Sequence, residues 1–200
     1  SNVKDFPSYS KTKTQVDRLR LSLARSFLFS GMSDEAVSVV IECFEAEEKL
    51  AGDVVIKEGD AKADYLYLVD EGSLSVIING VHTPPKLKEG DIFGDLALIY
   101  NNPRAATVRC DTKSVLLRLH RKIFRQVTAS IQQQRDKEIK TFLSKTPLLK
   151  GLTSKQVDSI VDAVQIKSYT KGTTIFSKGS PGDIFYIIRS GRIAIKNIEG

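Results

Sequence analysis

The chain of 200 residues carries 30 Lys or Arg against 24 Asp or Glu, a formal net charge of +6, and 41% of its residues are hydrophobic. This length and apolar content suffice for one large domain or two small ones with a buried core. No apolar run is long enough to span a bilayer, and the polar start, Ser1–Lys13, is unlike a signal peptide. The composition therefore argues against a membrane partner and against a secreted protein.

The two cysteines, Cys43 and Cys110, lie far apart in the sequence, without a histidine nearby. That spacing argues against a disulfide framework and a zinc site, and it indicates a reducing, cytoplasmic compartment. His82 and His120 have no partner at catalytic or metal-ligand spacing, so both are interpreted as structural or solvated. We expect neither a metal nor a cofactor, and no enzyme activity.

The predicted elements begin with an N-terminal linker and helix over residues 1–25. Four apolar residues fall on one face of this helix: Val16, Leu19, Leu23 and Phe27. The run Arg18–Ser22 within it also reads as a kinase site or a decoy for one. The helix face is the preferred interpretation, and we expect any segment that blocks a kinase to precede Ser1.

A first domain is predicted over residues 26–145, and it opens with a second helix. The apolar face of this helix has the spacing i, i+3, i+4, i+7 in Val37, Val40, Ile41 and Phe44. Short apolar runs bounded by Gly and Asp then predict antiparallel strands: Val54–Ile56, Leu66–Val69, Leu74–Ile78 and Ser114–Leu119.

Turn signals separate the predicted strands. Asn79-Gly80 predicts a tight hairpin that leads into Val81, and Pro84 and Pro85 are expected to break regular pairing. A helix followed by many short antiparallel strands predicts a mainly β fold with flanking helices, a small jelly-roll β-barrel.

Connector helices are predicted at the end of this domain, in two apolar stripes separated by the polar residues 132–138. The stripes are Phe124, Val127 and Ile131, then Ile139, Phe142 and Leu143. Between Arg118 and Lys145 there are eight Lys or Arg against two acidic residues. Such a helix can bind nucleic acid or an acidic partner, but no aromatic residues interleave the charges, so a solvated face is preferred and no nucleic-acid partner is expected.

An internal repeat has a spacing of 120 residues. The matching pairs are Leu28 and Leu148, Gly31 and Gly151, Val37 and Val157, Gly52 and Gly172, Gly59 and Gly179, and, after a slip of one residue, Asp64 and Asp183, Tyr67 and Tyr186, Gly72 and Gly191. A helix opening with Thr153 and Gln156 in capping-box spacing begins the second copy. The repeat predicts a tandem second domain over residues 146–200, incomplete, with strands at Thr173–Phe176 and Ile184–Ile188 that expose apolar faces.

The candidate binding chemistry lies in residues Phe93–Val108, which we call the cassette segment. Gly94 allows a close backbone turn, Asp95–Ile99 fits one helical turn that Pro103 stops, and the planar guanidinium of Arg104 suits a phosphate. The first N–H groups of such a turn also favour an anion. The same residues can equally form a loop, a turn and a surface charge, so the residues alone leave phosphate binding open.

Two runs within the cassette segment resemble the sequence of a known family. Phe93–Tyr100 and Pro103–Val108 resemble the phosphate-binding cassette of the regulatory subunits of cyclic-AMP-dependent protein kinase. The resemblance covers nearly the whole chain, including the tandem copies and the connector that ends at Phe142–Lys145.

The resemblance implies a cyclic-nucleotide site built from Phe93, Gly94, Asp95, Leu96, Ala97, Pro103, Arg104, Ala105 and Ala106. In that family the arginine binds the cyclic phosphate, the acidic residue after the glycine binds the ribose 2′-hydroxyl, and backbone near the alanine caps the phosphate. These roles fall on Arg104, Asp95 and Ala97. Asp64 matches an aspartate that braces the arginine, and Lys155 lies near the position of a cap over the base.

The chain departs from the family in two ways. It has Asp95 where the family usually has Glu, so the ribose contact is expected to be longer or bridged by water. It also has no Trp, which leaves Lys155 as a poorer cover for the base.

The resemblance implies a regulatory module that inhibits a protein kinase catalytic subunit and releases it when cAMP binds. The nearest alternative is the regulatory half of a cyclic-GMP-dependent kinase. A nucleotide-sensing transcription factor would have a helix-turn-helix where a second copy follows here, and a sugar-modifying jelly-roll enzyme would need metal ligands that the sequence lacks. Ala105 offers no hydroxyl for a guanine amino group, which favours cAMP over cGMP. Because the second copy stops before its own cassette, we expect one nucleotide per chain.

Overall fold

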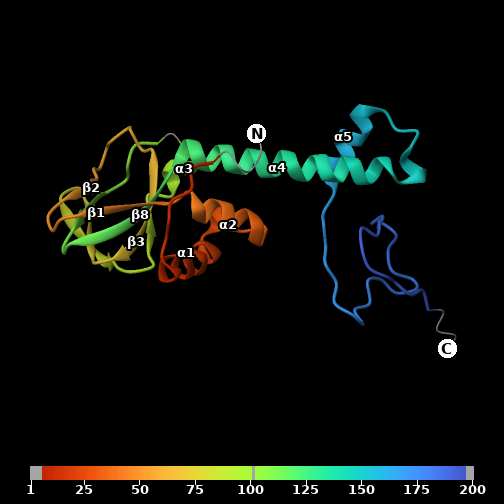
Figure 1. The fold of residues 1–200 in the computed structure, drawn as a ribbon, viewed down its shortest axis with the longest axis horizontal. Helices are drawn as coiled ribbons and strands as arrows, with labels where there is room; N and C mark the ends of the chain where they lie inside the picture. The colour runs from red at the N-terminus through yellow and green to blue at the C-terminus, as the bar shows by residue number, and fades with distance from the viewer. Residues whose placement is uncertain (1–5, 101, 197–200) are drawn as a thin grey trace. The chain divides into compact units, whose positions relative to one another are not determined.

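The computed structural model describes residues 6–100 and 102–196, apart from the side chains of Ala97, Leu98 and Leu148. The chain divides into two compact units, Ser1–Gln133 and Gln134–Gly200 (Figure 1). The boundary falls inside a long helix rather than in a loop.

The first unit is built on two four-stranded antiparallel sheets (Figure 1). In one sheet the order is β1-β8-β3-β6, formed by Glu45–Lys49, Ser114–His120, Tyr65–Glu71 and Ile92–Phe93. In the other the order is β2-β7-β4-β5, formed by Val54–Ile56, Thr107–Cys110, Leu74–Ile78 and Val81–Leu87. The prediction of a mainly β fold with flanking helices is confirmed.

The hairpin between β4 and β5 forms where the turn signal predicts it. Asn79 and Gly80 both have positive φ, +51° and +78°, the backbone that a two-residue turn between twisted strands requires. Strand β5 continues through Pro84 and Pro85 at the edge of its sheet, where proline is tolerated. The pairing register nevertheless shifts between Leu74 and Val76, so regular pairing is interrupted as expected.

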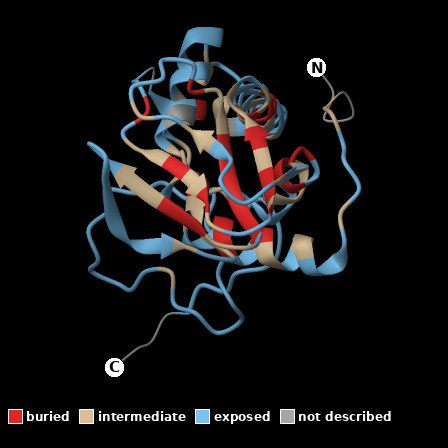
Figure 2. Cartoon of the chain, turned by 90° about the vertical axis from the view of Figure 1, so that its left-hand side faces the viewer, coloured by how far each residue is buried: buried red, intermediate tan, exposed pale blue. Residues whose placement is uncertain are grey.

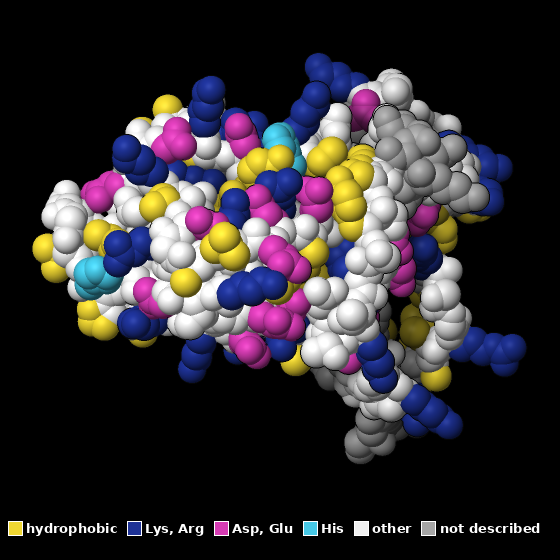
Figure 3. Space-filling model, turned by 60° about the vertical axis from the view of Figure 1, so that its left-hand side comes forward, with side chains coloured by type: hydrophobic (Ala, Val, Ile, Leu, Met, Phe, Trp, Pro, Cys, Tyr) yellow, Lys and Arg dark blue, Asp and Glu magenta, His cyan; other side chains and the backbone are white. Residues whose placement is uncertain are grey.

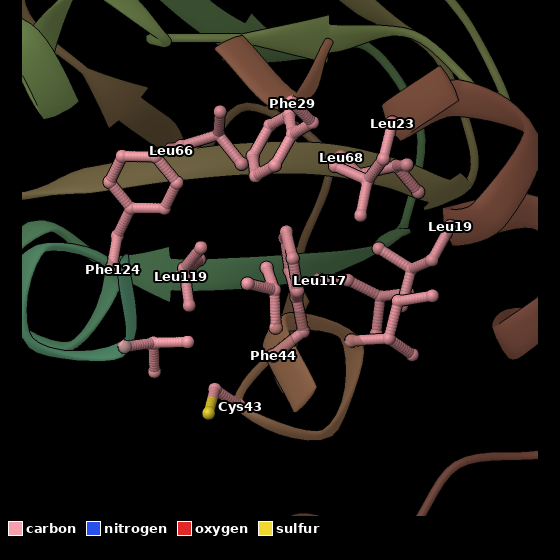
Figure 4. Packing of buried hydrophobic residues seen from close by; sticks show 13 residues of the cluster. Leu19, Leu23, Phe29, Cys43, Phe44, Leu66, Leu68, Leu117, Leu119 and Phe124 are labelled. Carbon is pink, nitrogen blue, oxygen red and sulfur yellow. The ribbon is translucent and has the colours of Figure 1, made fainter. Parts of the chain in front are cut away.

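The core lies on both faces of strand β3, since successive side chains of a strand point to opposite sides. Leu66 and Leu68 face the helices in a cluster with Leu117 and Leu119 of β8 (Figure 4). Tyr67 and Val69, one residue out of step, join Leu74, Phe93, Val108 and Leu116 in a second cluster. Figure 2 shows buried residues running along the strands accordingly.

Two N-terminal helices complete the first cluster. Helix α1 (Lys13–Arg25) starts at a capping box of Thr12 and Gln15 and buries Leu19 and Leu23 fully. Helix α2 (Asp34–Glu42) is capped by Ser33. The apolar face predicted for α1 is wrong in one residue, because Phe27 lies beyond the helix, in the 3₁₀ turn η2 (Phe27–Phe29), and is 84% exposed.

The connector is one helix, which corrects the prediction of separate helices. Helix α4 runs from Arg121 to Ser144 without a break at residues 132–134. Helical hydrogen bonds do not need apolar side chains, so an exposed polar stretch can remain helical when both of its flanks are packed. Within the described residues, no helix combines the length and the apolar character that crossing a membrane requires.

The second unit packs the end of α4 against α5 (Ser154–Ala163), with the 3₁₀ turn η3 (Pro147–Leu149) between them. Its cluster contains Ile139, Leu143 and Val161, and the capping box of Thr153 and Gln156 forms as predicted. The segments η2 and α2 therefore recur as η3 and α5 at a spacing of 120 residues.

The strands predicted at Thr173–Phe176 and Ile184–Ile188 are not present in the structure. A strand exists only when its backbone groups pair with a neighbour, and these segments have no paired strand among the described residues. Most of their apolar side chains are exposed, among them Phe176, Ile184, Phe185 and Ile188, while Ile175 and Ile187 are partly buried.

Candidate functional site

The cassette segment joins the two sheets of the first unit. Strand β6 ends at Phe93, the short helix α3 (Leu96–Ile99) follows, and strand β7 begins at Thr107. The helical turn is therefore where the sequence predicts it. It ends at Ile99 with Tyr100 as its cap, so the expectation that Pro103 stops it is wrong: the turn has closed before the proline is reached.

The beginning of the segment is fixed from the sheet. Phe93 is buried, its backbone pairs with Tyr67, and the two rings stack with centroids 5.1 Å apart. Gly94 follows with φ +72°, a backbone conformation that residues with a side chain rarely adopt. A Cβ at this position would lie 2.6 Å from Nη1 of Arg104 and 3.2 Å from the carbonyl oxygen of Tyr65. Gly94 thus makes room for the guanidinium.

Arg104 is buried and is held by main-chain carbonyls. Only 8% of its surface is exposed. Nη2 donates a hydrogen bond to the carbonyl of Tyr65 at 2.7 Å, and Nη1 donates one to the carbonyl of Gly94 at 3.2 Å. Its own backbone pairs with the loop after β2, through Asp60 and Gly59. Among the described residues the guanidinium forms no ion pair with a carboxylate.

Burial dominates the electrostatics of this arginine. Loss of hydration lowers the pKa of Arg104, and the Tyr67 phenol and the carboxylates of Asp60 and Asp64 act in the opposite direction. A cation that is largely removed from water without an ion-pair partner is destabilised. The site is therefore arranged to gain free energy when an anion reaches Arg104.

Asp95 caps its own helical turn. Its Oδ1 accepts a hydrogen bond from the N–H of Leu96 at 3.0 Å, and its side chain is partly exposed. The Leu96 side chain is also exposed, and the side chain of Ala97 lies outside the described part of the structure. The contact of Asp95 with a ribose hydroxyl and the capping of a phosphate near Ala97 stay predictions.

The three predicted site residues next to Arg104 in the sequence differ in their exposure. Pro103 and Ala105 are exposed, and Ala106 is partly buried. The low wall that the sequence predicts at Ala105 and Ala106 stays a prediction.

The predicted brace between Asp64 and Arg104 is not made. Oδ1 of Asp64 instead lies 3.4 Å from Nη2 of Arg121, and the Asp64 carbonyl accepts from the N–H of Arg121 at 2.7 Å. The carboxylate thus belongs to the first turn of α4, while two carbonyls hold Arg104. Carbonyl contacts leave no trace in side-chain patterns, so the sequence could not indicate Tyr65 as a partner.

Lys155 lies in the first turn of α5, in the second unit, with an exposed side chain. Its contact with a base stays a prediction. Within the described ranges, no three His, Cys, Asp or Glu side chains gather in a group that could hold a metal ion.

Two hollows lie on the first unit, and one of them reaches the cassette segment at Asp95. One, of about 500 Å³, is lined by Asp64, His120, Arg121, Lys122, Arg125, Gln126 and Ala129. The other, of about 340 Å³, is lined by Ser22, Arg25, Ser26, Phe27, Gly90, Asp91, Ile92 and Asp95. Neither includes Arg104. Figure 3 shows basic and acidic side chains interspersed over the visible face rather than gathered in a patch of one sign.

Comparisons with known proteins agree with this architecture. Residues 47–130 match the family model of the Cyclic nucleotide-binding domain. The cAMP-dependent protein kinase regulatory subunit of Aspergillus fumigatus is 37% identical over 97% of this chain and 50% of its own length. The chain thus spans about half the length of the curated relatives it matches.

Two solved structures extend the likeness to three dimensions. cAMP-bound PfPKA-R is 30% identical with a TM-score of 0.55, covering 88% of this chain and 64% of the other. The regulatory domain of Toxoplasma gondii PKA with cAMP is 31% identical with a TM-score of 0.52, covering 78% of this chain and 60% of the other. The chain therefore carries a cyclic nucleotide-binding domain and is homologous, over most of its length, to the regulatory subunits of cAMP-dependent protein kinase.

Proposed function

We propose that the chain is a cAMP-binding regulatory module that holds a protein kinase catalytic subunit inactive and releases it when cAMP binds. One observation supports the binding step above the others: Arg104 is buried, is fixed by two carbonyls and has no ion-pair partner among the described residues. A cyclic phosphate supplies the missing negative charge, and a guanidinium binds phosphate oxygens with paired hydrogen bonds.

The names of the relatives support the rest of the proposal. The curated homologues are named regulatory subunits of cAMP-dependent protein kinase, which favours this family over the cyclic-GMP-dependent kinase. The module would act by binding rather than by catalysis, with the nucleotide and a kinase subunit as its partners. The incomplete second domain, the binding of one nucleotide per chain and a cytoplasmic location stay predictions.

Gating requires that cAMP bind more tightly to one arrangement of the protein than to another. The cassette segment has a direct route to α4, since Nη2 of Arg125 donates to the carbonyl of Ile99, at the end of α3, at 3.2 Å. A ligand that shifts α3 would therefore shift the first turns of α4. We propose that this contact links the nucleotide to the helix that leads out of the first unit.

Isothermal titration calorimetry with cAMP tests the binding step. Arg104→Ala should weaken binding by about 2–5 kcal/mol, the usual cost of removing one partner of a buried charge pair. Arg104→Lys should also bind poorly because an ammonium lacks the planar fork. Arg109→Ala is the matched control: Arg109 lies on β7, with Nη2 3.5 Å from Nε2 of His82.

The same titration with cGMP tests the ligand. Ala105 lacks a hydroxyl, so cGMP should bind roughly tenfold more weakly than cAMP, the difference that about one hydrogen bond makes.

Equal affinity of wild type and Arg104→Ala for cAMP would remove the phosphate assignment. Tighter binding of cGMP would point to the other kinase family.

A further inference from the structure

The inner face of the first sheet carries an aromatic residue beside Arg104 that the sequence analysis does not assign to the site. Tyr67 is 7% exposed and belongs to the cluster between the two sheets, together with Phe93 and Val108. Its backbone pairs with Phe93 on one side and with Arg118 on the other. Tyr67 therefore lies on the strand next to the start of the cassette segment.

Arg104 reaches the same strand. Its Nη2 is bound to the carbonyl of Tyr65, two residues before Tyr67, and its Nη1 to the carbonyl of Gly94, one residue after Phe93. The Tyr67 ring stacks on Phe93 with an interplanar angle of 13°. The Tyr67 ring and the Arg104 guanidinium are thus both held where β3 pairs with β6.

The hydroxyl of Tyr67 has no hydrogen-bond partner in the described part of the chain. It makes no hydrogen bond among the described residues, although every fully buried side-chain oxygen and nitrogen of the described part has one. The hydroxyl oxygen must therefore touch accessible space even though the rest of the side chain is buried. A hydroxyl that reaches accessible space without a protein partner is available to hydrogen-bond a ligand.

The charges around this hydroxyl suit an anion. Burial raises the pKa of the Tyr67 phenol, Glu47 acts in the same direction, and Arg104 and Arg118 act in the opposite direction, so the phenol stays protonated and can donate. Glu47 is itself paired with Arg118 at 3.2 Å. Neither guanidinium can accept a hydrogen bond, so the phenol O–H remains a donor for a ligand.

We propose that Tyr67 is a second phosphate-binding residue, whose hydroxyl donates a hydrogen bond to the anion that Arg104 binds. The inference rests on the proposed function and deepens it, since it names a further contact of the same ligand. The stack of Tyr67 on Phe93 fixes the ring, so the hydroxyl is positioned before the ligand arrives and costs little ordering on binding.

Tyr67→Phe tests this by removing the hydroxyl and retaining the ring and its stack. We expect cAMP and cGMP each to bind about tenfold more weakly, because both share the phosphate and a hydrogen bond to a charged group has that weight. The melting temperature without ligand should remain unchanged. Tyr9→Phe is the matched control, because that ring lies outside the site, with Nζ of Lys11 5.9 Å from its centroid, and its affinity should equal that of wild type.

The two diastereomers of adenosine cyclic phosphorothioate locate the contact. Sulfur replaces one exocyclic oxygen in each, so the loss caused by Tyr67→Phe should be smaller for one diastereomer than for the other. Wild-type affinity of Tyr67→Phe for cAMP, or the same loss for both diastereomers, would overturn the inference while the proposed function stands. If the wild-type protein does not bind cAMP, the proposed function fails first.

Discussion

At the scale of single residues, Gly94 and Arg104 form one structural unit. Gly94 has a positive φ, and a Cβ at this position would lie 2.6 Å from Nη1 of Arg104, so a side chain at residue 94 would displace the guanidinium. The sequence predicts both residues, because a Gly before a helical turn and an Arg after a Pro are visible as letters. It does not predict that they touch, which depends on how the turn folds back onto β3.

Gly94→Ala should therefore weaken cAMP binding by tenfold or more without unfolding the protein. The new methyl group would push the guanidinium from its carbonyl partners, and the positive φ would also strain the backbone by roughly 1–2 kcal/mol. Gly80→Ala separates the two effects, since Gly80 has φ +78° with nothing within 4 Å of the added Cβ. Calorimetry should show weak binding only for Gly94→Ala; equal affinities for both variants would contradict the coupling of Gly94 to Arg104.

At the scale of elements, α4 is the part that belongs to both units. Ile131 packs against the core of the first unit, and Ile139 is buried in the cluster of the second. The residues 132–134 between them are exposed. The apolar periodicity thus predicts correctly which turns of α4 pack against a core. It does not show whether the polar stretch between those turns is helical, because that depends on the packed turns at its two ends.

Hydrogen exchange should show whether the exposed middle of α4 responds to the nucleotide. Adding cAMP should change exchange in the cassette segment and in α4 near residues 126–140, and leave β3 and β8 unchanged, because cross-strand pairs lock the sheet while an exposed helical stretch opens more readily. Mass spectrometry of peptides with and without cAMP measures this, and Arg104→Ala serves as the control that should respond nowhere. A change restricted to residues 93–108 would show that the site does not communicate with the helix.

At the scale of the whole molecule, the sequence predicts the elements that have a hydrophobic periodicity or belong to the internal repeat. Strands such as Leu66–Val69 have two buried faces in the structure, and their apolar runs are long enough to be recognised. The segments Thr173–Phe176 and Ile184–Ile188 have the same local pattern and form no strand, because pairing depends on a neighbour that local pattern does not supply. The partner of Asp64 was missed for the same reason: Arg121 is 57 residues away in the sequence.

The two cysteines allow the stability of the first unit to be followed as a whole. Cys43 is buried in the cluster that faces the helices, and Cys110 in the cluster between the sheets. Burial raises the pKa of both thiols, that of Cys43 to about 11, so little reactive thiolate exists in the folded protein near neutral pH. A thiol reagent should therefore label each cysteine through opening of the surrounding structure.

If cAMP binds only the folded first unit, it must slow that labelling. A ligand present at a hundred times its Kd stabilises the folded state by about 2.7 kcal/mol, which is roughly a hundredfold fewer open molecules. The variants Cys43→Ala and Cys110→Ala report one thiol each, and the slowing should be similar for both if the unit opens as one body. Arg104→Ala should abolish it. Slowing of Cys110 alone, next to the cassette segment on β7, would mean that the nucleotide stabilises its own neighbourhood and not the unit, and cAMP could then act on α4 through local contacts such as that of Arg125 with Ile99.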